Sequence, residues 1–106
     1  MKLVGKKVKI RWRRSFPEER VRVMIGTVTE MDETLMRAKG RFFFLAKGET
    51  EPRLDDFDKD VVIPFSSINV IRVLPDDMDL ENLEYETVWN RILVRVPDGE
   101  STTLSE

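Results

Sequence analysis

The stretch IGTVTEMDETLM, from Ile25 to Met36, places a glycine inside a strand-like sequence and an aspartate six residues later. Alternating β-branched residues before the aspartate and apolar residues after it predict two strands joined by a tight turn. Gly26 would weaken a flat strand, but it allows a sharp bend and the close approach of a neighbouring backbone. Asp32 can accept hydrogen bonds from backbone N–H groups of the turn. The stretch therefore predicts a bent strand, a capped turn and a return strand.

Strand-like segments lie on both sides of this stretch. The segment Lys6–Arg14 alternates basic and apolar residues, as a half-buried strand does. The segment Val21–Met31 has apolar residues on both faces, so we expect it to be covered on both sides. Gly40 is expected to permit a bend or bulge in the segment Leu35–Leu45. The expected elements are strands over Lys6–Arg14, Val21–Met31, Leu35–Leu45, Val61–Phe65 and Asn69–Pro75, an exposed loop over residues 46–60 and a tight turn over Ser66–Ile68.

Five short strands joined mostly by tight turns are typical of an all-β barrel or curled sheet. The expected fold is a small, strongly bent, five-stranded barrel over residues 1–75. Residues 76–106 are expected to form a C-terminal extension with one helical turn, a further strand over Thr87–Val96 and a polar tail. The helical turn would be capped by Asp76 or Asp77 and would make its contacts through Met78, Leu80 and Leu83.

The composition excludes several kinds of site. The 106 residues include no cysteine and no histidine, which rules out disulfides, thiol nucleophiles, histidine bases and the usual zinc sites. Asp56, Asp58 and Asp60 alternate as in a calcium loop, but Val61 and Ser67 stand where that loop needs glycine and glutamate. We therefore expect no metal, no cofactor and no enzymatic activity. No apolar run approaches membrane-spanning length, so a cytoplasmic protein without a membrane partner is expected.

The charges are distributed unevenly along the chain. Residues 1–22 carry nine Lys or Arg and two Glu, whereas residues 49–106 carry five Lys or Arg and fifteen Asp or Glu. Alternate residues of the first strand stand about 6.6–6.8 Å apart, a spacing that can follow a phosphate backbone. Its basic face is therefore an RNA-binding candidate, with Trp12 expected on the opposite face. The residues that could extend it are Ser15, Phe16, Arg20 and Arg22. The alternative is a solvated face that discourages edge aggregation. The basic residues are Lys7, Lys9, Arg11 and Arg13.

Two motifs resemble those of the Sm-like (LSm/Hfq-type) family. The first is the spacing of Gly26, Val28, Met31–Asp32 and Leu35, and the second is the rhythm of Val61–Pro75, a short strand, a tight turn and a last strand. The resemblance implies an SH3-like five-stranded barrel that binds single-stranded RNA. It also implies a homo-oligomeric ring of five to seven subunits, in which head-to-tail pairing covers the unpaired strand edges. The implied RNA-binding positions are Asp32, Met36, Phe65 and Ser66.

The chain departs from the family pattern at the base pocket. Met36 stands where the family has an asparagine, and Pro64-Phe65 stands where the eukaryotic and archaeal members have arginine-glycine. The bacterial branch has a lysine-histidine pair there, and this chain has no histidine. Base recognition needs stacking side chains and polar groups that reach base edges. Two hypotheses follow: an RNA-binding or RNA-chaperone ring, and a structural or protein-interaction ring that has lost the base pocket.

Overall fold

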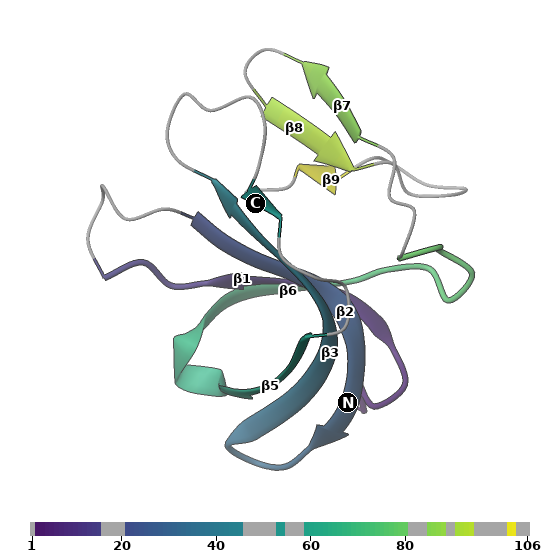
Figure 1. The fold of residues 1–106 in the computed structure, drawn as a ribbon. Helices are drawn as coiled ribbons and strands as arrows, with labels where there is room; N and C mark the ends of the chain where they lie inside the picture. The colour runs from purple at the N-terminus through teal and green to yellow at the C-terminus, as the bar shows by residue number, and fades with distance from the viewer. Residues whose placement is uncertain are drawn as a thin grey trace.

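The computed structural model describes residues 2–15, 21–45, 53–54, 59–80, 85–88, 91–94 and 102–103. These residues form antiparallel strands and one 3-10 turn, so the expected all-β class is confirmed (Figure 1). The main sheet has the order β4-β3-β2-β1-β6, with β5 also paired to β3. Its elements are β1 (Lys7–Trp12), β2 (Val21–Met31), β3 (Leu35–Leu45), β4 (Arg53–Leu54), β5 (Lys59–Pro64), the 3-10 turn η1 (Phe65–Ser67) and β6 (Ile68–Val73).

The two longest strands, β2 and β3, curve together through the sheet (Figure 1). Gly26 and Gly40 are directly opposed partners in this pair. A Cβ on Gly26 would lie 3.0 Å from the Gly40 Cα and closer still to the Lys39 backbone. The pair therefore allows the close backbone approach that the sequence predicted for Gly26. The bulge of this strand pair lies elsewhere, between Val28 and Glu30.

The bend divides β3 between two partners. Its first half, Leu35 to Gly40, pairs with β5, and Phe43 and Phe44 pair with β4. The expectation of an unbroken exposed loop over residues 46–60 is therefore wrong at Arg53–Leu54 and at Lys59–Asp60, which lie in strands. These residues are mostly charged, so the local sequence does not predict strands there. Hydrogen bonds to β3 hold them in strand conformation. The rest of that loop lies outside the described residues.

Two apolar cores lie on opposite faces of β2, so the prediction that this strand is covered on both sides is confirmed. Alternate residues of β2 face opposite sides of the sheet. Met24 and Val28 belong to one of them, the first core, with Leu3, Val8, Ile10, Met36, Ala38, Ile63 and Ile68. Val23 and Ile25 belong to the other, the second core, with Phe43, Leu74, Met78 and Leu80.

The segment after β6 closes the second core. Leu74, Met78 and Leu80 are buried there, as the sequence predicted for the last two. The Met78 N–H donates to the Pro75 carbonyl at 3.2 Å, which makes a tight turn. The predicted helical turn is therefore wrong for residues 76–80, because Pro75 and two aspartates fit a tight turn as well as a helix start. Leu83 lies outside the described residues.

A second sheet contains β7 (Tyr85–Val88), β8 (Arg91–Val94) and β9 (Thr102–Thr103), in the order β7-β8-β9. The single strand predicted over Thr87–Val96 is therefore wrong. Val88 and Arg91 are paired across β7 and β8, so the chain reverses between them. Val88, Ile92 and Val94 keep the same period of two on both sides of that point, and such a period cannot reveal a two-residue connection. In the part of the chain that the structure describes, no helix has the length and apolarity needed to cross a membrane.

Candidate nucleic-acid interface

The basic residues of β1 do not form the exposed face that the sequence predicts. Lys9 is only 1% exposed, and Lys7 is half-buried with its Nζ donating to the Met78 carbonyl. The cross-strand partner of Lys9 is Ile25, which belongs to the second core. Cross-strand partners share a face, so Lys9 points towards that core and not into solvent. The expectation of a solvated basic stripe is therefore wrong at Lys9.

The other two basic residues of the stripe differ in their surroundings. Arg11 is half-buried, and its Nε has no hydrogen-bond partner among the described residues. Arg13 is exposed and bound to the turn η1 and to the residue after it. Its backbone N–H donates to the Ser67 carbonyl at 2.9 Å, and its Nε donates to the Ile68 carbonyl at 3.0 Å. Only Arg13 of the four therefore presents an exposed guanidinium.

Asp32 caps the turn between β2 and β3, as the sequence predicted. Its Oδ1 accepts hydrogen bonds from the backbone N–H groups of Thr34 and Leu35, both at 2.8 Å. The Asp32 N–H in turn donates to the Leu35 carbonyl at 3.0 Å. These backbone hydrogen bonds, from Thr34 first and Leu35 second, lower the pKa of Asp32 below its usual 3.8. The carboxylate is therefore a fixed anion that shapes the turn.

A cavity of about 400 Å³ opens beside this turn, and we call it the turn cavity. Met36 is 1% exposed, because its side chain packs in the first core. The Arg37 guanidinium binds Asp60 at 2.8 and 2.9 Å and lies 3.8 Å from the Glu30 carboxylate. The only cation of the lining is thus already matched by acids. The lining residues are Glu30, Met31, Asp32, Leu35, Met36, Arg37 and Val62.

The two motif turns meet in the structure. The Phe65 N–H donates to the Thr34 carbonyl at 2.9 Å, which joins η1 to the β2–β3 turn. Phe65 is half-buried against the first core, and Ser66 is exposed. Asp32 and Met36 therefore share one cavity, as predicted, whereas Ser66 faces a different cavity together with Arg13.

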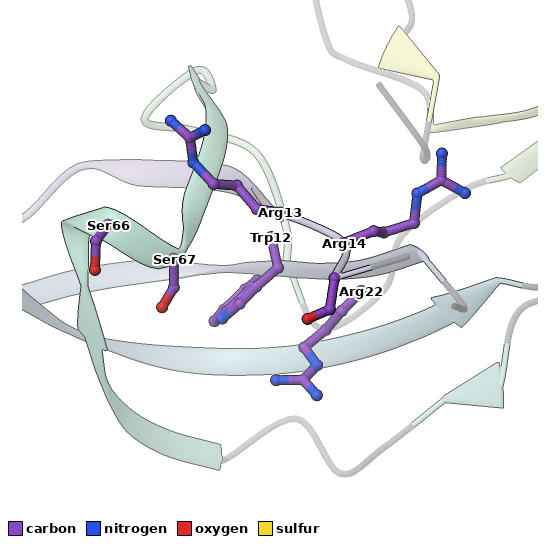
Figure 2. Close-up of a pocket in the computed structure, with 7 residues that line it drawn as sticks. Trp12, Arg13, Arg14, Arg22, Ser66 and Ser67 are labelled. Atoms are coloured by element: carbon purple, nitrogen blue, oxygen red, sulfur yellow. The ribbon is translucent and has the colours of Figure 1, made fainter. Parts of the chain in front are cut away.

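This second cavity, also of about 400 Å³, is the arginine cavity (Figure 2). The Arg22 guanidinium lies 5.9 Å from the centroid of the Trp12 ring, so aromatic and basic groups do meet here. Trp12 packs against the first core with Val8 and Ile10, so the prediction that it lies on the opposite face from Lys9 and Arg11 is confirmed. It meets Arg22 because Arg22 of β2 lies on the same face as Met24, which belongs to that core. The lining residues are Trp12, Arg13, Arg14, Ser15, Arg22, Ser66 and Ser67.

Sequence reasoning missed Arg14 and Ser67 as members of this cavity, and it missed the contact of Trp12 with Arg22. The signal was present in the run Arg11 to Ser15, RWRRS, which concentrates cations around a tryptophan at a strand end. What the sequence does not show is that η1 folds back beside this run. No grouping of three acidic side chains fit for a metal ion occurs within the described ranges.

Comparisons with family models, with curated proteins and with solved structures give no match to this chain.

Proposed function

We propose that the protein is an Sm-like RNA-binding protein that assembles into a homo-oligomeric ring of five to seven copies. The strand order β6-β1-β2-β3-β5 supports a small bent barrel whose sheet ends at β5 and β6. Among the described residues, β5 pairs only with β3 and β6 only with β1. An unpaired strand edge invites pairing with another chain.

The side chains at these two edges support assembly. Val62 on β5 is 60% exposed, and Val70 and Val73 on β6 are 42% and 48% exposed. Apolar residues on open edge strands favour pairing over solvation. If β5 of one copy pairs with β6 of the next, each copy uses two different edges, so the contact is heterologous and can close into a ring.

The hydrogen bond from the Phe65 N–H to the Thr34 carbonyl, 2.9 Å long, is the observation that carries RNA binding. It joins the two turns that resemble the base-binding motifs of the Sm-like family, with Asp32 and Met36 beside the junction. A ring would bring several such junctions around one axis, where a single RNA strand could contact them in succession. The function is binding and not catalysis, since neither cavity joins a nucleophile with a general base among the described residues.

A scaffold ring that has lost the base pocket is the second candidate. Buried Met36 offers no donor to a base edge, and Asp60 and Glu30 already engage the Arg37 guanidinium. Both features weaken the turn cavity as a site for an anionic nucleic acid.

Fluorescence-anisotropy titration with labelled oligo-U and oligo-A at two salt concentrations separates the candidates, with the particle mass measured by light scattering. An RNA-binding ring gives saturable binding that weakens with salt. An intact ring that binds neither oligonucleotide at low salt supports the scaffold. The proposal of RNA binding is then withdrawn.

A further inference from the structure

We propose that the arginine cavity is a phosphate-binding site that holds the phosphate groups of a ribonucleotide chain. The inference rests on the proposed RNA-binding function for the source of the phosphate, but the site itself can be tested separately. Its lining comes from three parts of the fold: the end of β1 with the residues after it, the start of β2, and η1 (Figure 2).

The cavity concentrates positive charge. Arg13, Arg14 and Arg22 line it, and none of its lining residues that the structure describes is acidic. An anion in the cavity would lie near the Arg13 and Arg22 side chains, whose positive charges attract it. The turn cavity shows the opposite arrangement, with two carboxylates and one matched arginine. Of the two cavities, only the arginine cavity therefore suits an anion.

Two of the arginines are held in place before any ligand binds. The Nε of Arg13 donates to the Ile68 carbonyl, which fixes the guanidinium and leaves its terminal N–H groups for other acceptors. The Arg22 guanidinium lies 5.9 Å from the Trp12 ring centroid and 6.0 Å from that of Phe44. Such ordering lowers the entropy lost on binding. A planar guanidinium can also donate two parallel hydrogen bonds to one phosphate.

Serine hydroxyls complete the lining. Ser66 and Ser67 add O–H donors, which are common partners of phosphate oxygens in nucleic-acid complexes. The volume of about 400 Å³ falls within the range of small-ligand sites, so it can hold a phosphate with part of its sugar.

Phosphate fits the geometry better than a stacked base does. Trp12 already contacts Phe42, with ring centroids 5.3 Å apart, and Arg22 lies over its ring. A base could stack on Trp12 only by displacing one of these neighbours. A phosphate can accept hydrogen bonds from Arg22 while the guanidinium stays over the Trp12 ring, because the N–H groups of a guanidinium point outward in its own plane.

The test compares the wild-type protein with the double variant Arg13→Gln/Arg22→Gln and the single variant Arg22→Lys. Lys39→Gln is the control, since Lys39 is an exposed cation that lines neither cavity. Two probes are titrated: labelled oligo-U by anisotropy, and uridine monophosphate by calorimetry. Thermal melting establishes that each variant is folded.

The site predicts that the double variant weakens oligo-U binding by at least about tenfold and lowers its salt slope by about 1.4. Arg22→Lys keeps the positive charge but loses the two parallel N–H donors of the guanidinium, so it weakens oligo-U binding less than the double variant does. Lys39→Gln weakens that binding least. Uridine monophosphate bound by the wild type but not by the double variant also supports the site, even if oligo-U is not bound and the RNA function fails. Oligo-U binding that the folded double variant retains at the Lys39→Gln level overturns the site and leaves RNA binding intact. Binding of neither probe by the wild type overturns both.

Discussion

Gly26 of β2 and Gly40 of β3 face each other as direct partners, and neither position has room for a Cβ. A Cβ on Gly40 would lie 2.5 Å from the Gly26 Cα. The two glycines thus bring the strands together where they bend. The bend places the first half of β3 against β5 and the turn at Asp32 beside η1.

Gly26→Ala is expected to destabilise the fold by about 3 kcal/mol, because the new methyl group overlaps backbone atoms that cannot rotate away. Gly5→Ala is the matched control. Gly5 has a φ of 84° with open space around it, so its cost of about 1 kcal/mol is conformational only. Urea unfolding measures both values. Equal destabilisation by the two substitutions would contradict the close approach at the bend.

Asp32→Ala is expected to lower the melting temperature at pH 7 and to have a smaller effect at pH 3, below the usual pKa of a carboxyl group. The folded pKa of Asp32 is depressed below 3.8, so its stabilising contribution is present above pH 3.8 and disappears as the pH falls through the folded value. Glu33→Ala, at the neighbouring exposed acid, is the control. Melting curves at both pH values provide the comparison. A pH-independent effect of Asp32→Ala would mean that the charge of Asp32 does not support the turn.

Lys9→Met is expected to leave RNA affinity unchanged, although Lys9 is central to the basic strand in sequence. The side chain is buried towards the second core, so it cannot reach a phosphate. Methionine has a similar length and suits an apolar site. Anisotropy with oligo-U measures the affinity, and Arg13→Gln, at an exposed arginine, is the comparison. An equal loss from both folded variants would show that the strand face binds RNA.

Val62→Asp is expected to dissociate the ring into single chains without unfolding them. Val62 is 60% exposed on the edge strand β5, so a charge there costs a single chain no more than about 0.5 kcal/mol. The same charge opposes apolar pairing between copies. Val4→Asp, at a valine that is 53% exposed outside any strand, is the matched control and should keep the ring. Light scattering reports the masses. A ring that survives Val62→Asp would rule out assembly through this edge.

The sequence predicted those parts of the fold that depend on local periodicity. Alternation in β2 correctly indicated burial on both faces, and the spacing of Gly26 and Asp32 correctly indicated the bend and the capped turn. It failed where distant segments decide the outcome. Lys9 has the alternation of an exposed residue, but the second core covers it.

The candidate site depends even more on distant contacts. Asp32 and Met36 are neighbours in sequence, and their shared cavity was expected. The arginine cavity joins residues 12–15, Arg22 and residues 66–67, and Trp12 meets Arg22 because both lie on the face of the sheet that carries the first core. Strand alternation correctly places Trp12 on the opposite face from Lys9 and Arg11, but it contains no information on which residue of β2 lies beside Trp12.

The most direct test of the central claim is the mass of the protein eluting with labelled oligo-U from a size-exclusion column, measured by light scattering. The account predicts one peak that contains RNA and has a protein mass of five to seven times the 12.4 kDa of one chain. Protein that elutes as a single chain, or as a ring from which the RNA separates at low salt, would contradict it.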